Sequence, residues 1–163
     1  MIGIDIGCDG GIAVLDEVGD IINMEKPRLA SLSGKKEWDG YWLANILEEF
    51  RHMEPIMYIE ACGYHYRNVQ AARSLAMCEG IIVGVASSLG YGIERVQAKV
   101  WQKALMGKIP QGRTKEFALD YAQQRWPQGD WTKSKRATKA DDGFVDAALI
   151  ALYGLHKDKG LEL

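Results

Sequence analysis

Four carboxylates at widely separated positions are the residues of this chain best suited to do chemistry. Asp5 lies in the apolar segment MIGIDIG, Glu60 ends the segment MYIE, and Asp142 and Asp146 lie in DDGFVDAALIALYG. Carboxylates crowded into one pocket repel one another and persist only with protons or cations to neutralise them. Hard oxygen ligands favour Mg²⁺ or Mn²⁺ over zinc. Two such ions about 4 Å apart would activate a water and stabilise the leaving oxygen in phosphodiester hydrolysis.

The N-terminal segment predicts a strand that carries Asp5. Isoleucine occupies every second position from residue 2 to residue 6, so the Asp5 side chain points away from the isoleucine face. Turn-forming residues follow at 8–11, and apolar segments at 12–15 and 21–24 complete an antiparallel meander. Because a carboxylate in such a strand is rarely there for stability, we interpret Asp5 as functional.

Helices and strands alternate along the rest of the chain. Residues 27–36 have the composition of a loop, and apolar residues at helical spacing from Trp38 to Phe50 predict an amphipathic helix. Asn68 is suited to cap a helix that runs to about residue 89. The order indicates one α/β domain over 1–163, with a mixed sheet covered by helices. Its further elements are predicted as strands at 57–60 and 93–96 and helices at 98–106, 114–125 and 141–156.

The spacing of Asp142 and Asp146 puts both on one face of the last helix, because residues four apart are neighbours on a helix. The apolar side chains of this helix suggest that it packs on the sheet, which would bring its first turns to Asp5 and Glu60. A structural alternative is that these acids favour the positive end of the helix dipole. Asp141 shares that alternative and projects about 100° away from Asp142.

The charge is divided unevenly along the chain, although the net charge is only -2. Residues 1–98 hold 8 Lys and Arg against 14 Asp and Glu, whereas residues 99–140 hold 10 against 3. A basic block favours contact with a polyanion, because neutralising phosphates releases condensed counterions. A solvated helical face is the alternative interpretation.

Composition excludes a disordered chain, a collagen and a small disulfide-stapled protein. A chain of 163 residues with 47% hydrophobic residues has the material for one core without disulfides. The three cysteines form no CxxC pair, which suits a reducing cytoplasm. We expect no signal peptide, because no basic region precedes the first apolar segment. The longest apolar stretch, 76–89, is interrupted by Glu79 and is too short to span a membrane.

Taken together, these segments resemble the RuvC family of Holliday junction resolvases, especially its phage-type members, in the ribonuclease H-like superfamily. IGIDIGCDGGIAVLD is similar to the family's opening strand, and YIEACGYHYRNVQAARSLAMCEGIIVGV to its acidic strand and following helix. RVQAKVWQKALMG, KEFALDYAQQRWP and DDGFVDAALIALYG resemble the later blocks in order. The resemblance implies a mixed five-stranded sheet, three antiparallel strands and then two parallel, flanked by helices. It also implies a Mg²⁺-dependent homodimer that cuts opposing strands of a four-way DNA junction.

The resemblance also implies roles for individual residues. Asp5, Glu60, Asp142 and Asp146 would hold the metal, and the segment DDGFVD at 141–146, which contains the last two, matches the D-x-G-x-x-D pattern of phage relatives. Bacterial members space the last two acids differently, which leaves Asp141 or Asp142 open as the third ligand. Lys115 and Lys103 resemble lysines near the scissile phosphate, with Lys103 displaced by one position. The expected DNA contacts, aromatic residues that open the junction and basic residues along its arms, are Tyr64, Tyr66, Arg67, Lys99, Lys103, Lys108, Arg113, Lys133, Lys135, Arg136 and Lys139.

Alternative functions are kept beside this one. GKIPQGRT at 107–114 differs from a phosphate-binding P-loop at Arg113 and follows a predicted helix rather than a strand. Actin-like and sugar-kinase ATPases have opening segments similar to DIGCDGG. These ATPases enclose a nucleotide between two such subdomains, however, and this chain is long enough for only one. A less selective nuclease of branched or flap DNA or of RNA remains open. So does a junction-binding module without catalysis.

Overall fold

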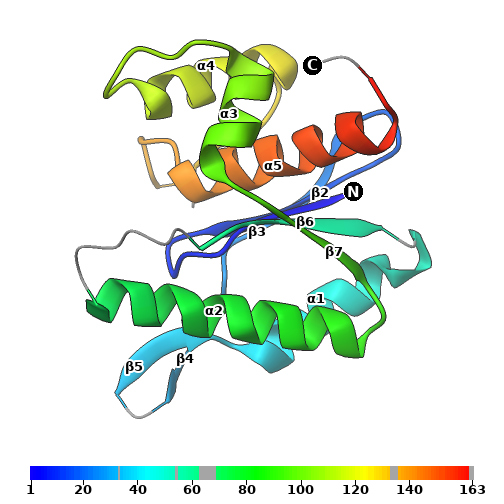
Figure 1. Ribbon diagram of the computed structural model, residues 1–163, viewed down its shortest axis with the longest axis vertical. Coiled ribbons are helices and arrows are strands. Elements are labelled where there is room, and N and C mark those ends of the chain that lie inside the picture. Colours follow the sequence, from blue (N-terminus) through cyan, green and yellow to red (C-terminus); the bar gives the residue numbers. More distant parts are fainter. Residues whose placement is uncertain (33, 54, 63–68, 133–135, 162–163) are drawn as a thin grey trace.

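The computed structural model describes residues 1–163 except 33, 54, 63–68, 133–135 and 162–163, and shows one sheet between two helical layers (Figure 1). The helices are α1 (Gly40–Phe50), α2 (Val69–Ser88), α3 (Ala98–Met106), α4 (Thr114–Arg125) and α5 (Asp142–Asp158), with a short 3-10 helix, η1 (Arg51–Met53). The strands are β1 (Ile2–Asp5), β2 (Gly11–Leu15), β3 (Ile21–Glu25), β4 (Leu29–Leu32), β5 (Lys35–Trp38), β6 (Ile56–Glu60) and β7 (Gly92–Val96).

The main sheet has five strands in the order β3-β2-β1-β6-β7. The first three strands along the chain pair antiparallel, whereas β1 with β6 and β6 with β7 pair parallel. This confirms the predicted mixed sheet and its ribonuclease H-like arrangement. In the β1–β6 register Ile4 lies beside Ile59, so Asp5 and Glu60, the next residues, end their strands at the same edge.

The two faces of the sheet bury separate apolar clusters. The isoleucines of β1 pack with α1 and α2, while α5 covers the other face and α3 and α4 pack against α5. Helix α5 lies directly against β1, because a Cβ atom added to Gly3 would be 2.2 Å from the carbonyl oxygen of Ala147. A Cβ on Gly143 would similarly be 2.4 Å from the carbonyl oxygen of Asp9. Glycine at these positions therefore allows α5 to lie close against β1 and against the turn that follows it.

Two predictions for residues 27–50 were wrong. The predicted loop at 27–36 contains most of a two-stranded hairpin, β4 with β5, whose turn includes Gly34 at a φ of 76°. Trp38 ends β5 instead of beginning the helix, since the Asp39 side chain accepts hydrogen bonds from the N–H groups of Tyr41 and Trp42 and caps α1. Trp38 is buried, and its indole N–H donates to the carbonyl of Gly7 at 3.0 Å.

Helix α2 begins before the apolar stretch at 76–89 and is longer than that stretch. It spans 20 residues and, by length and composition alone, is the one helix of the described chain apolar enough to cross a membrane. Its buried residues, Cys78, Ile82 and Ala86, face the sheet. Of the 18-residue stretch of this helix with the highest mean hydropathy, 17% is buried. The proposed cap, Asn68, lies outside the described residues.

Candidate active site

Strand ends and the beginning of a helix bring the predicted carboxylates to one edge of the sheet. Asp5 is the last residue of β1 and Glu60 the last of β6. Asp142 is the first residue of α5, and Asp146 lies one turn later. The backbone N–H of Gly7 donates to Oδ1 of Asp5 at 3.2 Å, so the turn after β1 holds this carboxylate.

Electrostatic interactions show that these carboxylates are near one another. Burial raises the pKa of Asp146 to about 8, and the charges of Asp5, Glu60 and Asp142 add to that rise. The pKa of Glu60 is raised to about 7, first by burial and then by Asp5. The pKa of Asp5 is also raised, chiefly by burial, although the Gly7 N–H and Lys26 act in the opposite direction. Three half-buried acids thus disfavour one another's charged forms.

The two aspartates at the start of α5 have different surroundings. Asp141 is the N-cap: its side chain accepts from the N–H of Phe144 at 3.3 Å and pairs with Lys26 at 2.8 Å. Asp142 forms an ion pair with Lys115 and its side chain is 40% exposed, against 12% for Asp141. Capping and the Lys26 pair therefore already engage the Asp141 carboxylate, while Asp142 faces the same side as Asp146.

The chemistry of this donor set fits a hard divalent cation. The ligands would be carboxylate oxygens from three separate elements, and none of Asp5, Glu60 and Asp146 forms an ion pair with a basic side chain of the described chain. Burial and, after it, mutual repulsion raise the pKa values of these acids, and a bound cation would relieve the repulsion. In the present side-chain positions, however, no group of three His, Cys, Asp or Glu among the described residues is arranged to hold an ion.

Lys26 is a basic residue at this edge that the sequence analysis did not single out. Its ammonium lies between the carbonyl of Asp9, to which it donates at 2.5 Å, and the Asp141 carboxylate. Strand pairing explains its position: Glu25 lies opposite Ile12 and Asp5 opposite Gly11, so Lys26 comes level with the end of β1, with β2 between them. Register between the predicted strands was the only signal that could have found it.

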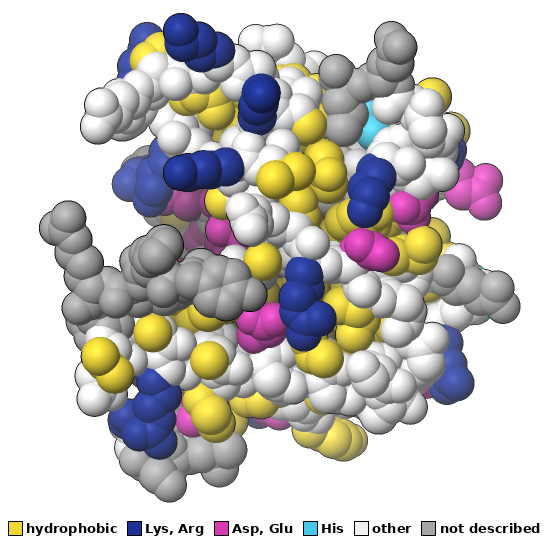
Figure 2. Space-filling view, in the orientation of Figure 1, with side chains coloured by type: hydrophobic (Ala, Val, Ile, Leu, Met, Phe, Trp, Pro, Cys, Tyr) yellow, Lys and Arg dark blue, Asp and Glu magenta, His cyan; other side chains and the backbone are white. Residues whose placement is uncertain are grey.

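The predicted DNA contacts that fall within the described chain are all exposed, on α3, on α4 and on the segments before α4 and α5. They are Lys99, Lys103, Lys108, Arg113, Lys115, Arg136 and Lys139. Arg113 is paired with Glu116 at 2.5 Å, and Arg136 and Lys139 line a hollow of 540 Å³ that also contains Asp142. At the left of Figure 2, basic side chains lie above an acidic recess and others lie below it. Tyr64, Tyr66, Arg67, Lys133 and Lys135 lie outside the described residues.

Two solved structures have a similar fold over almost the whole chain. One is described as T. thermophilus RuvC in complex with Holliday junction substrate; it is 16% identical, with a TM-score of 0.65, over 98% of this chain and 94% of that one. A second Thermus thermophilus RuvC structure is 18% identical, with a TM-score of 0.59, over 98% of this chain and 95% of that one. No protein-family model and no curated protein sequence matches the chain. The chain therefore has a RuvC-like fold.

Proposed function

We propose that this protein is a Mg²⁺-dependent, structure-selective DNA endonuclease that resolves four-way junctions by paired phosphodiester hydrolysis, in recombination, repair or phage DNA processing. A shared fold does not by itself assign an activity. The observation that carries the proposal is the convergence of Asp5, Glu60 and Asp146 at one sheet edge, where burial and mutual charge raise their pKa values. The resolvase fold of the two similar structures supports it.

In this proposal Asp5, Glu60, Asp142 and Asp146 hold two Mg²⁺ ions, for which Mn²⁺ substitutes. When bound, the ions supply a nucleophile at neutral pH and charge stabilisation at the phosphodiester. We assign Asp142 rather than Asp141 as the ligand, because Asp141 is engaged as the helix cap. Lys115, beside Asp142, contributes a positive charge where the transferred phosphate gains negative charge.

The DNA would lie along the exposed basic residues of α3, α4 and the segment before α5. Their contacts with phosphates orient the duplex arms and make binding dependent on salt. Tyr64 or Tyr66 would stack on an unpaired base at the crossover, an interaction worth about 1 to 3 kcal/mol. Arg67, Lys133 and Lys135 belong to the same proposed surface. We place the protein in the cytoplasm of a bacterial or phage-infected cell.

We also propose that the enzyme is a homodimer joined through α2. Val69 and Met77 on this helix are 77% and 42% exposed, and apolar side chains that gather on one exposed face suit a protein interface. A Cβ added to Gly80 or Gly84 would meet no atom within 4 Å, so this side of the helix is open to a second backbone. Paired cutting requires two sites, which a symmetric dimer supplies. Light scattering of the purified protein and of Gly84→Arg tests the dimer; a monomeric parent contradicts it.

Cleavage of matched four-way, three-way and linear DNA, with and without Mg²⁺, tests the activity. We expect Mg²⁺-dependent cutting of the four-way junction at symmetric positions and little cutting of linear duplex. Asp146→Asn should abolish cutting and retain junction binding. Equal cutting of all branched substrates would indicate a less selective nuclease. Junction binding without cutting by the parent protein would indicate a binding module, and cutting by Asp146→Asn at the parent rate would refute the assigned site.

A further inference from the structure

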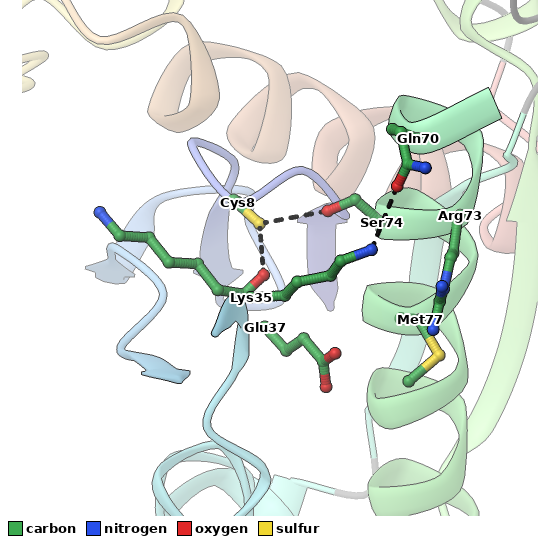
Figure 3. A pocket seen from close by; sticks show the side chains of 8 residues that line it. Cys8, Lys35, Glu37, Gln70, Arg73, Ser74 and Met77 are labelled. Carbon is green, nitrogen blue, oxygen red and sulfur yellow. Dashed lines mark hydrogen bonds between the residues drawn. The ribbon is translucent and has the colours of Figure 1, made fainter. Parts of the chain in front are cut away.

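A cavity beside the active site contains basic residues that the proposed function has not used. It has a volume of 290 Å³ and lies between the β4–β5 hairpin, the turn after β1 and the first turns of α2. In Figure 3, Lys35 reaches from the hairpin toward Gln70 on α2, to which its ammonium donates at 3.1 Å. Cys8, in the turn after β1, and Ser74, on α2, have their Sγ and Oγ atoms 3.8 Å apart.

The charges of this cavity are available to a ligand. Lys35, Lys36 and Arg73 line it with one acid, Glu37, and none of the three basic residues forms an ion pair within the described chain. This contrasts with most other arginines, since those at 28, 51, 95, 113 and 125 are each paired with a carboxylate. The cavity therefore carries more positive than negative charge, and Ser74 and Gln70 add a hydroxyl and an amide group to its lining.

Short contacts connect the cavity with the carboxylates. The Cys8 thiol donates to the carbonyl of Lys36 at 3.5 Å, and the Trp38 indole donates to the carbonyl of Gly7. Gly7 in turn holds Asp5 through its backbone N–H. The hairpin and the Asp5 turn are thus packed together. The cavity lies beside α2, on one face of the sheet, whereas α3 and α4 with their basic residues lie on the side of the other face. Figure 2 shows basic side chains above and below the acidic recess at its left.

We propose that this cavity binds backbone phosphates of the DNA strand that leaves the active site on the side of the β4–β5 hairpin. The inference rests on the proposed function and extends its DNA contacts to Lys35, Lys36 and Arg73. Arg, Lys, Ser and Gln side chains are the groups that contact phosphate oxygens in protein–DNA complexes. A strand crossing the carboxylates would then be held on both sides of the bond that is cut.

The test measures junction affinity between 50 and 300 mM KCl without divalent ions, in the full chain carrying Asp146→Asn so that no strand is cut. Adding Lys35→Ala and Arg73→Ala removes two phosphate contacts. We expect the slope of log affinity against log salt to flatten by about two units per protomer, with an affinity loss of about 10-fold or more at 150 mM.

The matched control removes two charges that are also exposed but lie elsewhere, through Arg51→Ala and Lys157→Ala. These residues pair with Glu48 and Glu94 and do not line the cavity. The control should keep the parent slope. An unchanged slope in Lys35→Ala/Arg73→Ala would overturn the inference while leaving the proposed function intact. Failure of the parent to bind any branched DNA would refute the proposed function and this inference with it.

The half-buried Cys8 gives a second measurement that needs no charge substitution. Its rate of alkylation by N-ethylmaleimide, followed by peptide mass mapping, reports whether the cavity is covered. Bound junction should slow alkylation of Cys8 several-fold relative to the protein alone. If the double variant does not fold, this measurement decides, and equal rates with and without saturating junction would overturn the inference.

Discussion

Replacing Asp146 by Asn should stabilise the metal-free protein, although it removes a residue assigned to catalysis. At pH 7 an aspartate in the unfolded chain is ionised, whereas burial and the neighbouring acids raise the Asp146 pKa to about 8 in the fold. The ordinary value is 3.8, so keeping the proton at pH 7 costs about three pH units, or about 4 kcal/mol as an upper bound. Asparagine carries no charge and avoids this cost.

We expect Asp146→Asn to gain about 2 to 4 kcal/mol of unfolding free energy at pH 7, measured by urea denaturation in EDTA. The Tm should rise by about 5 to 12 °C for a domain of this size. Because the folded pKa values of Asp146 and Glu60 are raised, the parent's stability should fall as pH rises from about 4 to 8, and this fall should be shallower in the variant.

Asp120→Asn is the matched control, because Asp120 is an exposed acid on α4 away from the carboxylates. Its stability should stay within about 0.5 kcal/mol of the parent. Mg²⁺ at 100 times its dissociation constant should stabilise the parent by about 2.7 kcal/mol and the Asp146→Asn variant by much less. A less stable Asp146→Asn in EDTA would refute the argument, since it would show that the carboxylate makes net favourable contacts.

Three further substitutions test the surrounding structure. Gly3→Ala should cost about 3 kcal/mol or more in urea denaturation, because the added Cβ meets the Ala147 carbonyl, whereas Gly40→Ala has ordinary contacts and should change stability by less than about 1 kcal/mol. Tyr58→Phe removes the hydroxyl that donates to Asp158 at 2.7 Å and should cost about 1 kcal/mol in the same assay; an unchanged midpoint contradicts this. Lys115→Ala should slow single-turnover cleavage by about 10- to 100-fold with junction affinity changed only a few-fold, and an equal loss in both would show that Lys115 only binds DNA.

The parts of the fold set by local pattern were predictable from the sequence. The alternation in β1 and the turn residues after it predicted a meander, and the spacing of Asp142 and Asp146 predicted their common helix face. The β4–β5 hairpin was missed because its strands are only four residues long and carry no sustained alternation. Trp38 was assigned to the helix by spacing, whereas a cap at Asp39 and a contact with Gly7 decide its place.

The electrostatics of the site could not be predicted without the tertiary structure. Helix spacing separates the faces of Asp141 and Asp142, but it does not show what each carboxylate contacts. Strand register brings Lys26 to Asp141, while α4 brings Lys115 to Asp142. The same register places Asp5 and Glu60 at one edge, and the close approach of α5 to Gly3 then adds Asp146. Each carboxylate is thus tolerable on its own element, and the burial and repulsion that raise their pKa values arise only from packing those elements together.

Because this repulsion depends on packing, the fold must supply stability elsewhere to maintain it. The buried contact of α5 with β1 does so, since its residues Ala147, Ala148 and Ala151 are fully buried against the sheet. Small side chains there let the helix approach closely, and that approach is what brings Asp146 to the sheet edge. The apolar packing and the crowding of the carboxylates therefore result from one geometry. A substitution that moved α5 away from the sheet would both relieve the repulsion and move the proposed metal ligands apart.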